Sequence, residues 1–95
     1  HNQDKVSMGT IAARDCLRVL ELSEQVAAAM LVAARQGLAL RQRLAPGLVL
    51  PAPLAAMQAD LEARIPLIDE DRALDRELRA LVDAIRAREW SLHAP

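Results

Sequence analysis

The sequence predicts an all-α fold in which one long core helix is followed by two shorter helices. Three observations lead to this prediction. The apolar content rests mainly on Ala and Leu, which favour helices, and Phe and Tyr are absent. Residues 7–44 contain no proline, and apolar residues recur there at helical spacing. Proline-containing breaks then divide the rest of the chain into short segments.

The long core helix is predicted over residues 11–44. Its first apolar face comprises Ala13, Leu17, Leu20, Ala27, Leu31, Ala34 and Leu38. A second face comprises Val19, Val26, Met30 and Leu40. Because every residue of 26–34 is apolar, we expect this segment to be buried on all sides, in part by other chains or by other parts of a larger protein. The run is too short to span a membrane.

Two shorter helices are predicted after a Pro/Gly loop at residues 45–53. The first covers residues 54–65 and ends before Pro66, and its apolar stripe comprises Leu54, Met57, Leu61 and Ile65. The second, the C-terminal helix, covers residues 71–90, with the acidic run 69–71 favouring its positive end. Its inward face comprises Leu74, Leu78, Leu81 and Ile85. We expect the chain from Trp90 onward to fray unless Trp90 packs on a partner.

Residues 1–10 are predicted to form a polar loop in front of the long helix. Asn2 and Gln3 are neutral amides, each with donors and an acceptor. A polar loop held against the start of a rigid helix is a common way to aim side chains into a site. Most loops of this kind are simple connectors, so the pattern of residue types alone does not identify a function.

The residue strings are more specific than the residue types. They resemble the aromatic amino-acid ammonia-lyases and aminomutases, which act on phenylalanine, tyrosine or histidine and depend on a methylidene-imidazolone electrophile. The strings that carry the resemblance are His1-Asn2-Gln3-Asp4, Val6-Ser7-Met8-Gly9-Thr10, Leu31-Val32-Ala33-Ala34-Arg35-Gln36, Ala63-Arg64-Ile65-Pro66-Leu67 and Asp69-Glu70-Asp71-Arg72. They follow the order of the C-terminal part of such an enzyme. The resemblance therefore implies that the whole chain is a fragment of a larger helical-bundle enzyme.

The resemblance implies that residues 1–10 are an active-site loop and that Asn2 and Gln3 are catalytic and cofactor-binding residues. In the family, amides at these positions touch the electrophile and the substrate. Neutral amides can hydrogen-bond the electrophile without burying a charge. The electrophile forms from an Ala-Ser-Gly triplet, and the family's general base is a tyrosine. This sequence contains neither, so both must come from elsewhere in the parent protein, and the fragment alone is expected to be inactive.

Gln3 also bears on the substrate. The histidine-specific branch of the family typically has an acidic residue at this position, which can engage an imidazole. An amide suits a phenyl or phenol ring, so Gln3 favours phenylalanine or tyrosine over histidine. The sequence does not separate a lyase, which releases an aryl acrylate, from a 2,3-aminomutase, which adds the ammonia back at the β-carbon.

Charge and cysteine content exclude several other classes of function. The net charge is −1 with acidic and basic residues nearly balanced, which gives no electrostatic case for nucleic acid or membrane partners. No His/Cys cluster is present, so no metal site is expected. The single Cys16 is expected to be a buried, inert thiol and fits a reducing cytoplasm.

The sequence therefore predicts the C-terminal part of an aromatic amino-acid ammonia-lyase or 2,3-aminomutase. Its expected partners are the rest of the parent polypeptide, further copies in a homotetramer, and a small aromatic amino acid, as the resemblance implies. The alternative is a helical self-association module without catalytic activity. Composition does not separate the two interpretations, but an electrophile-forming triplet upstream of His1 would.

Overall fold

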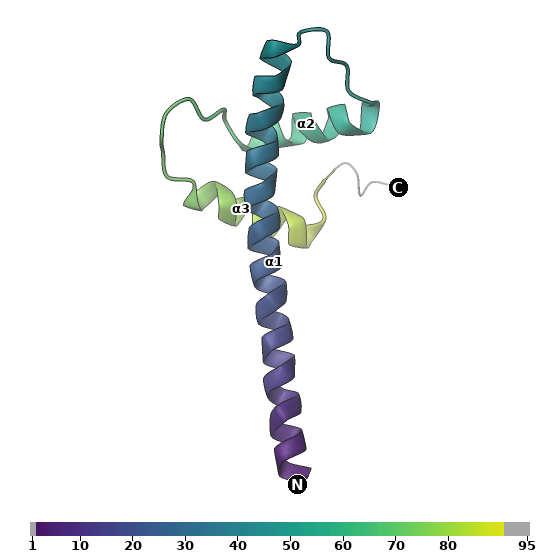
Figure 1. The fold of residues 1–95 in the computed structure, drawn as a ribbon, viewed down its shortest axis with the longest axis vertical. Helices are drawn as coiled ribbons and strands as arrows, with labels where there is room; N and C mark the ends of the chain where they lie inside the picture. The colour runs from purple at the N-terminus through teal and green to yellow at the C-terminus, as the bar shows by residue number, and fades with distance from the viewer. Residues whose placement is uncertain (1, 91–95) are drawn as a thin grey trace.

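The computed structural model describes residues 2–90, with side chains from Met8 onward. It contains three helices, α1 (Asn2–Leu44), α2 (Ala52–Arg64) and α3 (Asp75–Ala87), and no strand within the described residues. The predicted all-α fold, with a long helix before two shorter ones, is confirmed. Figure 1 shows α2 and α3 crossing the C-terminal half of α1, whereas its N-terminal half extends well beyond them.

The molecule is elongated. It measures 65 × 36 × 19 Å along its principal axes, and its radius of gyration is 18.3 Å. A compact domain of this length has a radius of gyration of about 12 Å. The excess comes from α1, whose N-terminal half has no other helix beside it (Figure 1). The fold is therefore a small core on one end of a long helical arm, which we define as residues 8–22.

The first ten residues differ from the prediction. Helix α1 begins at Asn2, so residues 2–10 are helical where a loop was predicted. His1 lies outside the described residues. No proline interrupts this stretch, and extending an existing helix costs far less than nucleating one. Gly9 weakens the helix by only about 1 kcal/mol relative to Ala.

Proline and glycine set the boundary between α1 and α2. Helix α1 ends at Leu44, with Arg41 and Arg43 in its last turn near the negative end of the helix dipole. Pro46 and Gly47 form the turn that follows. Pro53 then occupies the first turn of α2, where its missing N–H has no helical partner to lose.

Helix α2 ends one residue before its predicted limit, and α3 starts later than predicted. Ile65 is extended because Pro66 follows it, which disfavours helical backbone at Ile65. Helix α3 covers Asp75–Ala87 and not residues 71–90. The acidic run 69–71 therefore precedes the helix, and Asp75 and Glu77 supply the negative charge in its first turn.

The core lies where α2 and α3 cross α1. Its buried residues are Ala28, Val32, Leu61, Ile65, Leu81, Ala84 and Trp90. Leu31, Met57, Leu74, Leu78 and Ile85 are partly buried around it. The inward faces predicted for the two shorter helices are thus the faces that pack, apart from Leu54, which is exposed. Ala28 has no side chain beyond Cβ, so it lets α3 approach α1 closely.

Side-chain hydrogen bonds fasten the segment after α2 to α1. The Gln36 amide donates from Nε2 to the Ile68 carbonyl (2.7 Å), and its Oε1 accepts from the Ile68 N–H (3.0 Å). Arg35 Nε donates to the Ile65 carbonyl (2.8 Å). These bonds satisfy backbone groups that the irregular segment between α2 and α3 leaves without helical partners.

Trp90 is buried in the chain's own core, so the expectation that it needs a partner to pack is wrong for this residue, and the rest of the expected frayed tail, residues 91–95, lies outside the described residues. Arg88 adopts the left-handed helical conformation (φ 54°, ψ 47°), which ends α3 and reverses the chain. Trp90 is consequently 5% exposed. The Arg64 guanidinium lies 4.8 Å from the centre of its ring and also pairs with Glu89 at 3.2 Å.

One further expectation about α1, the burial of Cys16, is wrong, whereas the burial of residues 26–34 by other chains or by other parts of a larger protein stays a prediction. Cys16 is exposed, because it lies on the arm, beyond the reach of α2 and α3. The segment 26–34 is buried on one side only: Ala28 is 0% exposed, whereas Met30 is 67% exposed. A helix turns by about 100° per residue, so two residues on from a core position the side chain points away from the core.

Candidate functional site

Asn2 and Gln3, the predicted site residues, lie in the first turn of α1. Their side chains lie outside the described part of the structure, so only their backbone position is known. They are therefore consecutive helical residues at the N-terminal end of the described part of α1.

This end of α1 lies far from the chain's own core. Gln3 precedes Gln25 by 22 residues, which corresponds to about 33 Å along a helix. No other described helix runs beside the arm (Figure 1). A closed site around Asn2 and Gln3 thus needs groups from outside the described part of this chain.

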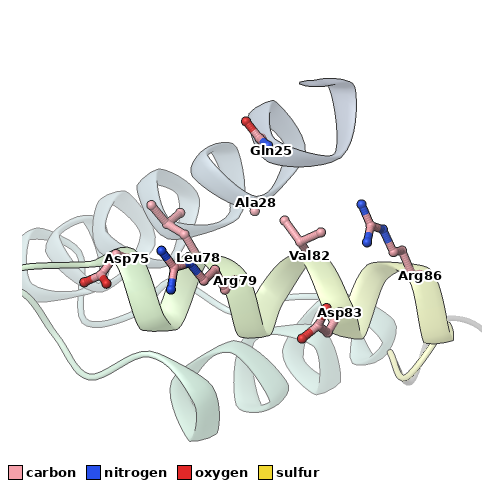
Figure 2. Close-up of a pocket in the computed structure, with 8 residues that line it drawn as sticks. All are labelled: Gln25, Ala28, Asp75, Leu78, Arg79, Val82, Asp83 and Arg86. Atoms are coloured by element: carbon pink, nitrogen blue, oxygen red, sulfur yellow. The ribbon is translucent and has the colours of Figure 1, made fainter. Parts of the chain in front are cut away.

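A groove lies between α1 and α3 in the core region (Figure 2). Its volume is about 490 Å³. The floor is apolar, with Ala28 from α1 and Leu78 and Val82 from α3. The remaining lining residues are Gln25, Asp75, Arg79, Asp83 and Arg86. Acidic and basic side chains alternate along α3 at this rim, so the groove has no dominant charge.

One end of the groove is fixed by an ion pair between helices. The Arg86 guanidinium donates from Nε to a Glu24 carboxylate oxygen. This hydrogen bond, together with the charge of Glu24, raises the pKa of Arg86 above its ordinary value. Arg86 therefore stays cationic at every pH at which the protein would be studied. The pair ties α3 to α1 across about 60 residues of sequence.

The groove was not predicted from the sequence. The only signal was the charge alternation on α3, which is also what a solvated helix face shows. The groove holds no nucleophile–base pair, and the structure does not bring it near Asn2 and Gln3. Among the described side chains, those of residues 8–90, no group of three His, Cys, Asp or Glu is arranged to hold a metal ion. None of the described helices combines the length and apolar character needed to cross a membrane.

The family model and the individual relatives that match this chain agree with each other. Residues 1–63 match the family model described as aromatic amino acid lyase. The whole chain is 38% identical to a histidine ammonia-lyase from Caenorhabditis elegans, of which it covers 14%. It is 35% identical, over 90% of its length, to a histidine ammonia-lyase from Sorangium cellulosum, of which it covers 16%. The whole chain is also 30% identical to a histidine ammonia-lyase from Shewanella piezotolerans, of which it covers 18%.

The chain thus spans less than one fifth of the length of these relatives. No solved structure matches it significantly. The family match includes the first turn of α1, the arm and most of α2, but not α3.

Proposed function

Because this chain belongs to the aromatic amino acid lyase family, we propose that it forms the C-terminal part of an aromatic amino-acid ammonia-lyase. The parent enzyme removes ammonia from the amino acid to give an aryl acrylate. A 2,3-aminomutase, which returns the ammonia to the β-carbon, is the variant of this proposal. The observation that carries it is the family match over residues 1–63, which includes Asn2 and Gln3 at the start of α1.

In this proposal Asn2 and Gln3 act as neutral hydrogen-bond donors at the reacting centre. An amide donates without a charge that would need a partner inside a closed site. Such donors favour a group that gains electron density during the reaction.

The family's methylidene-imidazolone supplies an electrophile for the substrate amine. The donor chemistry present here fits it, since neutral amides can hydrogen-bond its oxygen and nitrogen atoms. Asn2 and Gln3 are the residues of this chain that would hold it. Its Ala-Ser-Gly precursor is absent from the 95 residues, so it would form in another part of the parent polypeptide.

The proposed partners follow from what the chain lacks. It has no tyrosine to serve as the general base and no Ala-Ser-Gly triplet. The rest of the parent polypeptide, or neighbouring subunits of a homotetramer, would supply them. The exposed arm supports this proposal, because an isolated domain rarely leaves so many large apolar side chains in water. We place the assembled enzyme in the cytoplasm.

Different observations support two classes of substrate, histidine on the one hand and phenylalanine or tyrosine on the other. The names of the relatives favour histidine, since each is a histidine ammonia-lyase. Gln3 favours phenylalanine or tyrosine, because it stands where the resembled histidine branch has an acid. Measuring the specificity constants for all three amino acids on one enzyme decides between them.

A segment exchange tests the proposal. The chain would replace the matching segment of the Caenorhabditis elegans histidine ammonia-lyase, to which it aligns along its whole length. We expect the hybrid to release acrylate, measured by ultraviolet absorbance, and Asn2→Ala to lower turnover at least tenfold, or about 1.4 kcal/mol at the transition state. Gln25→Ala, an exposed amide farther along α1, is the matched control and should leave turnover unchanged. Equal losses in the two variants would remove Asn2 from the site.

The alternative, a helical self-association module without chemistry, is favoured by the exposed apolar residues of α1. It predicts a hybrid that assembles but gives no acrylate. The same segment exchange therefore separates the two functions, provided that assembly is measured by sedimentation alongside turnover.

A further inference from the structure

Among the contacts described between α1 and the other helices, the ion pair of Glu24 with Arg86 lies nearest the arm. The buried core residues of α1, Ala28 and Val32, come later along the helix. The side chain of Glu24 is only 16% exposed, although glutamate is ordinarily a surface residue. The Glu24 carboxylate is therefore largely covered, and the Arg86 guanidinium holds it from α3.

Packing alone does not fix the angle between α1 and α3 at this end of the core. The groove of about 490 Å³ lies between the two helices, lined by Gln25 of α1 and by Leu78 and Val82 of α3 (Figure 2). Interdigitated side chains fix the angle between two helices, whereas empty space beside them lets the angle change. The pair of Glu24 with Arg86 thus supplies a constraint that packing leaves out.

The start of α1 magnifies any change in this angle. Helix α1 is continuous over Asn2–Leu44 and contains no proline (Figure 1). Gln3 precedes Glu24 by 21 residues, which corresponds to about 32 Å along a helix. A tilt of about 1° at Glu24 therefore moves Gln3 by about 0.6 Å. Because groups at a reacting centre must be held within about 0.5 Å, a site at the start of α1 needs the angle fixed to about 1°.

We propose that Glu24 and Arg86 are positioning residues for Asn2 and Gln3. The pair fixes the angle at which α1 leaves the core, and through the length of the arm it sets the place of the two amides relative to the groups supplied from outside this chain. Arginine suits this task because its planar guanidinium donates in fixed directions, whereas a lysine ammonium does not. The inference rests on the proposed function, since it assigns a role toward the same site.

A second ion pair gives the matched comparison. Arg86 is 52% exposed, and ion pairs with such exposure contribute little to stability. The pair of Arg64 with Glu89 has similar exposure, but it joins α2 to the residues after α3 and does not involve α1. If both pairs only support the fold, breaking either one has the same effect. A positioning role requires that only the loss of Arg86 changes the direction of the arm and the rate of the reaction.

Spin labels on the 95-residue chain report the direction of the arm. Cys16, the single cysteine, is exposed on the arm, and Ala80→Cys places a second exposed label on α3. With labelled chains diluted in unlabelled chains, pulsed electron paramagnetic resonance gives the distribution of distances between the two labels. We expect one narrow distribution, which Arg86→Gln broadens and Arg64→Gln leaves unchanged. An equally narrow distribution for Arg86→Gln would overturn the proposal.

Turnover of the hybrid enzyme from the segment exchange tests the consequence for the reaction. We expect Arg86→Gln to lower kcat at least tenfold with little change in KM, because it displaces donors that act in the transition state. Arg64→Gln should leave kcat unchanged while it shifts the melting temperature at least as much. Glu24→Gln combined with Arg86→Gln should lower kcat no more than Arg86→Gln alone, because either change already breaks the pair.

Equal values of kcat for Arg86→Gln and Arg64→Gln would overturn the proposal, since the arm would then be held by other contacts. Multiplied losses in the double variant would overturn it too, because the two residues would act separately. The proposed function fails in a different way: an unmodified hybrid that assembles without releasing acrylate refutes it. The distribution of label distances then decides by itself whether the pair fixes the direction of α1.

Discussion

Removing the Trp90 side chain should be the most damaging single truncation in the core. Trp90 is 5% exposed and packs in the core where α2 and α3 cross α1. Burying an indole removes about 200 Å² from water, which corresponds to about 5 kcal/mol at 25 cal/mol per Å². Loss of the Arg64 contact, 4.8 Å from the ring centre, adds about 0.5–1 kcal/mol. Because alanine keeps part of this area and the unfolded chain already buries some of it, the sum is an upper bound, and we expect Trp90→Ala to cost about 3–5 kcal/mol.

Urea unfolding followed by circular dichroism measures this cost. Because Trp90→Ala removes a large share of a typical domain stability, it can leave too little folded protein to measure. Trp90→Phe keeps an aromatic ring and should cost about 1–2 kcal/mol. Arg64→Gln, which keeps the indole, isolates the contribution of the guanidinium and should cost about 1 kcal/mol or less. If Trp90→Ala costs less than about 1 kcal/mol, the indole is not part of the core and the original expectation of a frayed end is restored.

Three further predictions follow from the site and the core. The 95-residue chain alone should give no acrylate from phenylalanine, tyrosine or histidine, and any turnover by the pure chain would contradict its assignment as a fragment. In the hybrid enzyme, Gln3→Glu should lower turnover of phenylalanine or tyrosine about tenfold or more, and of histidine less, because imidazole can pair with the new acid. An unchanged ratio of the specificity constants would exclude Gln3 from the site. Gln36→Ala should cost about 1–3 kcal/mol in urea unfolding, since it leaves the Ile68 N–H and carbonyl without their partner; exposed Gln25→Ala is its control.

Local signals in the sequence predicted the helices and their inward faces. Pro46 and Gly47 end α1 through their own backbone properties, and Pro66 does the same for α2. The stripes that contain Leu61 and Leu81 pack because a 3.6-residue repeat puts them on one face. These features depend on residues within a few positions of each other, so a single sequence contains the information.

The features that the sequence did not predict depend on contacts between residues that are distant in sequence. Trp90 is buried because Arg88 reverses the chain, and non-glycine residues rarely adopt that conformation. Gln36 pairs with Ile68 across 32 positions, and no local pattern indicates such a bond. Two apolar faces were predicted on α1, but its buried core residues, Ala28 and Val32, belong to neither, and only the structure identifies the side that packs on α3.

For the candidate site, the sequence supplied the residues and their resemblance, and the structure corrected their backbone from loop to helix. The surrounding groups could not be predicted, because no described residue of α2 or α3 lies near the start of α1. The groove beside α3 was missed for another reason. It arises from the way two helices cross, and its rim residues individually look like an ordinary solvated face.

The helical arm has a consequence for local stability. Its amide hydrogens are protected from exchange with solvent only by the helix itself, because no tertiary contact has to break when a turn of the arm opens. Amides near Val32, by contrast, exchange only after α3 detaches. Covering the arm with another polypeptide would extend slow exchange toward the start of α1. The rigidity needed to hold a reacting group within a fraction of an ångström would then appear only on assembly, and activity would rise with subunit concentration.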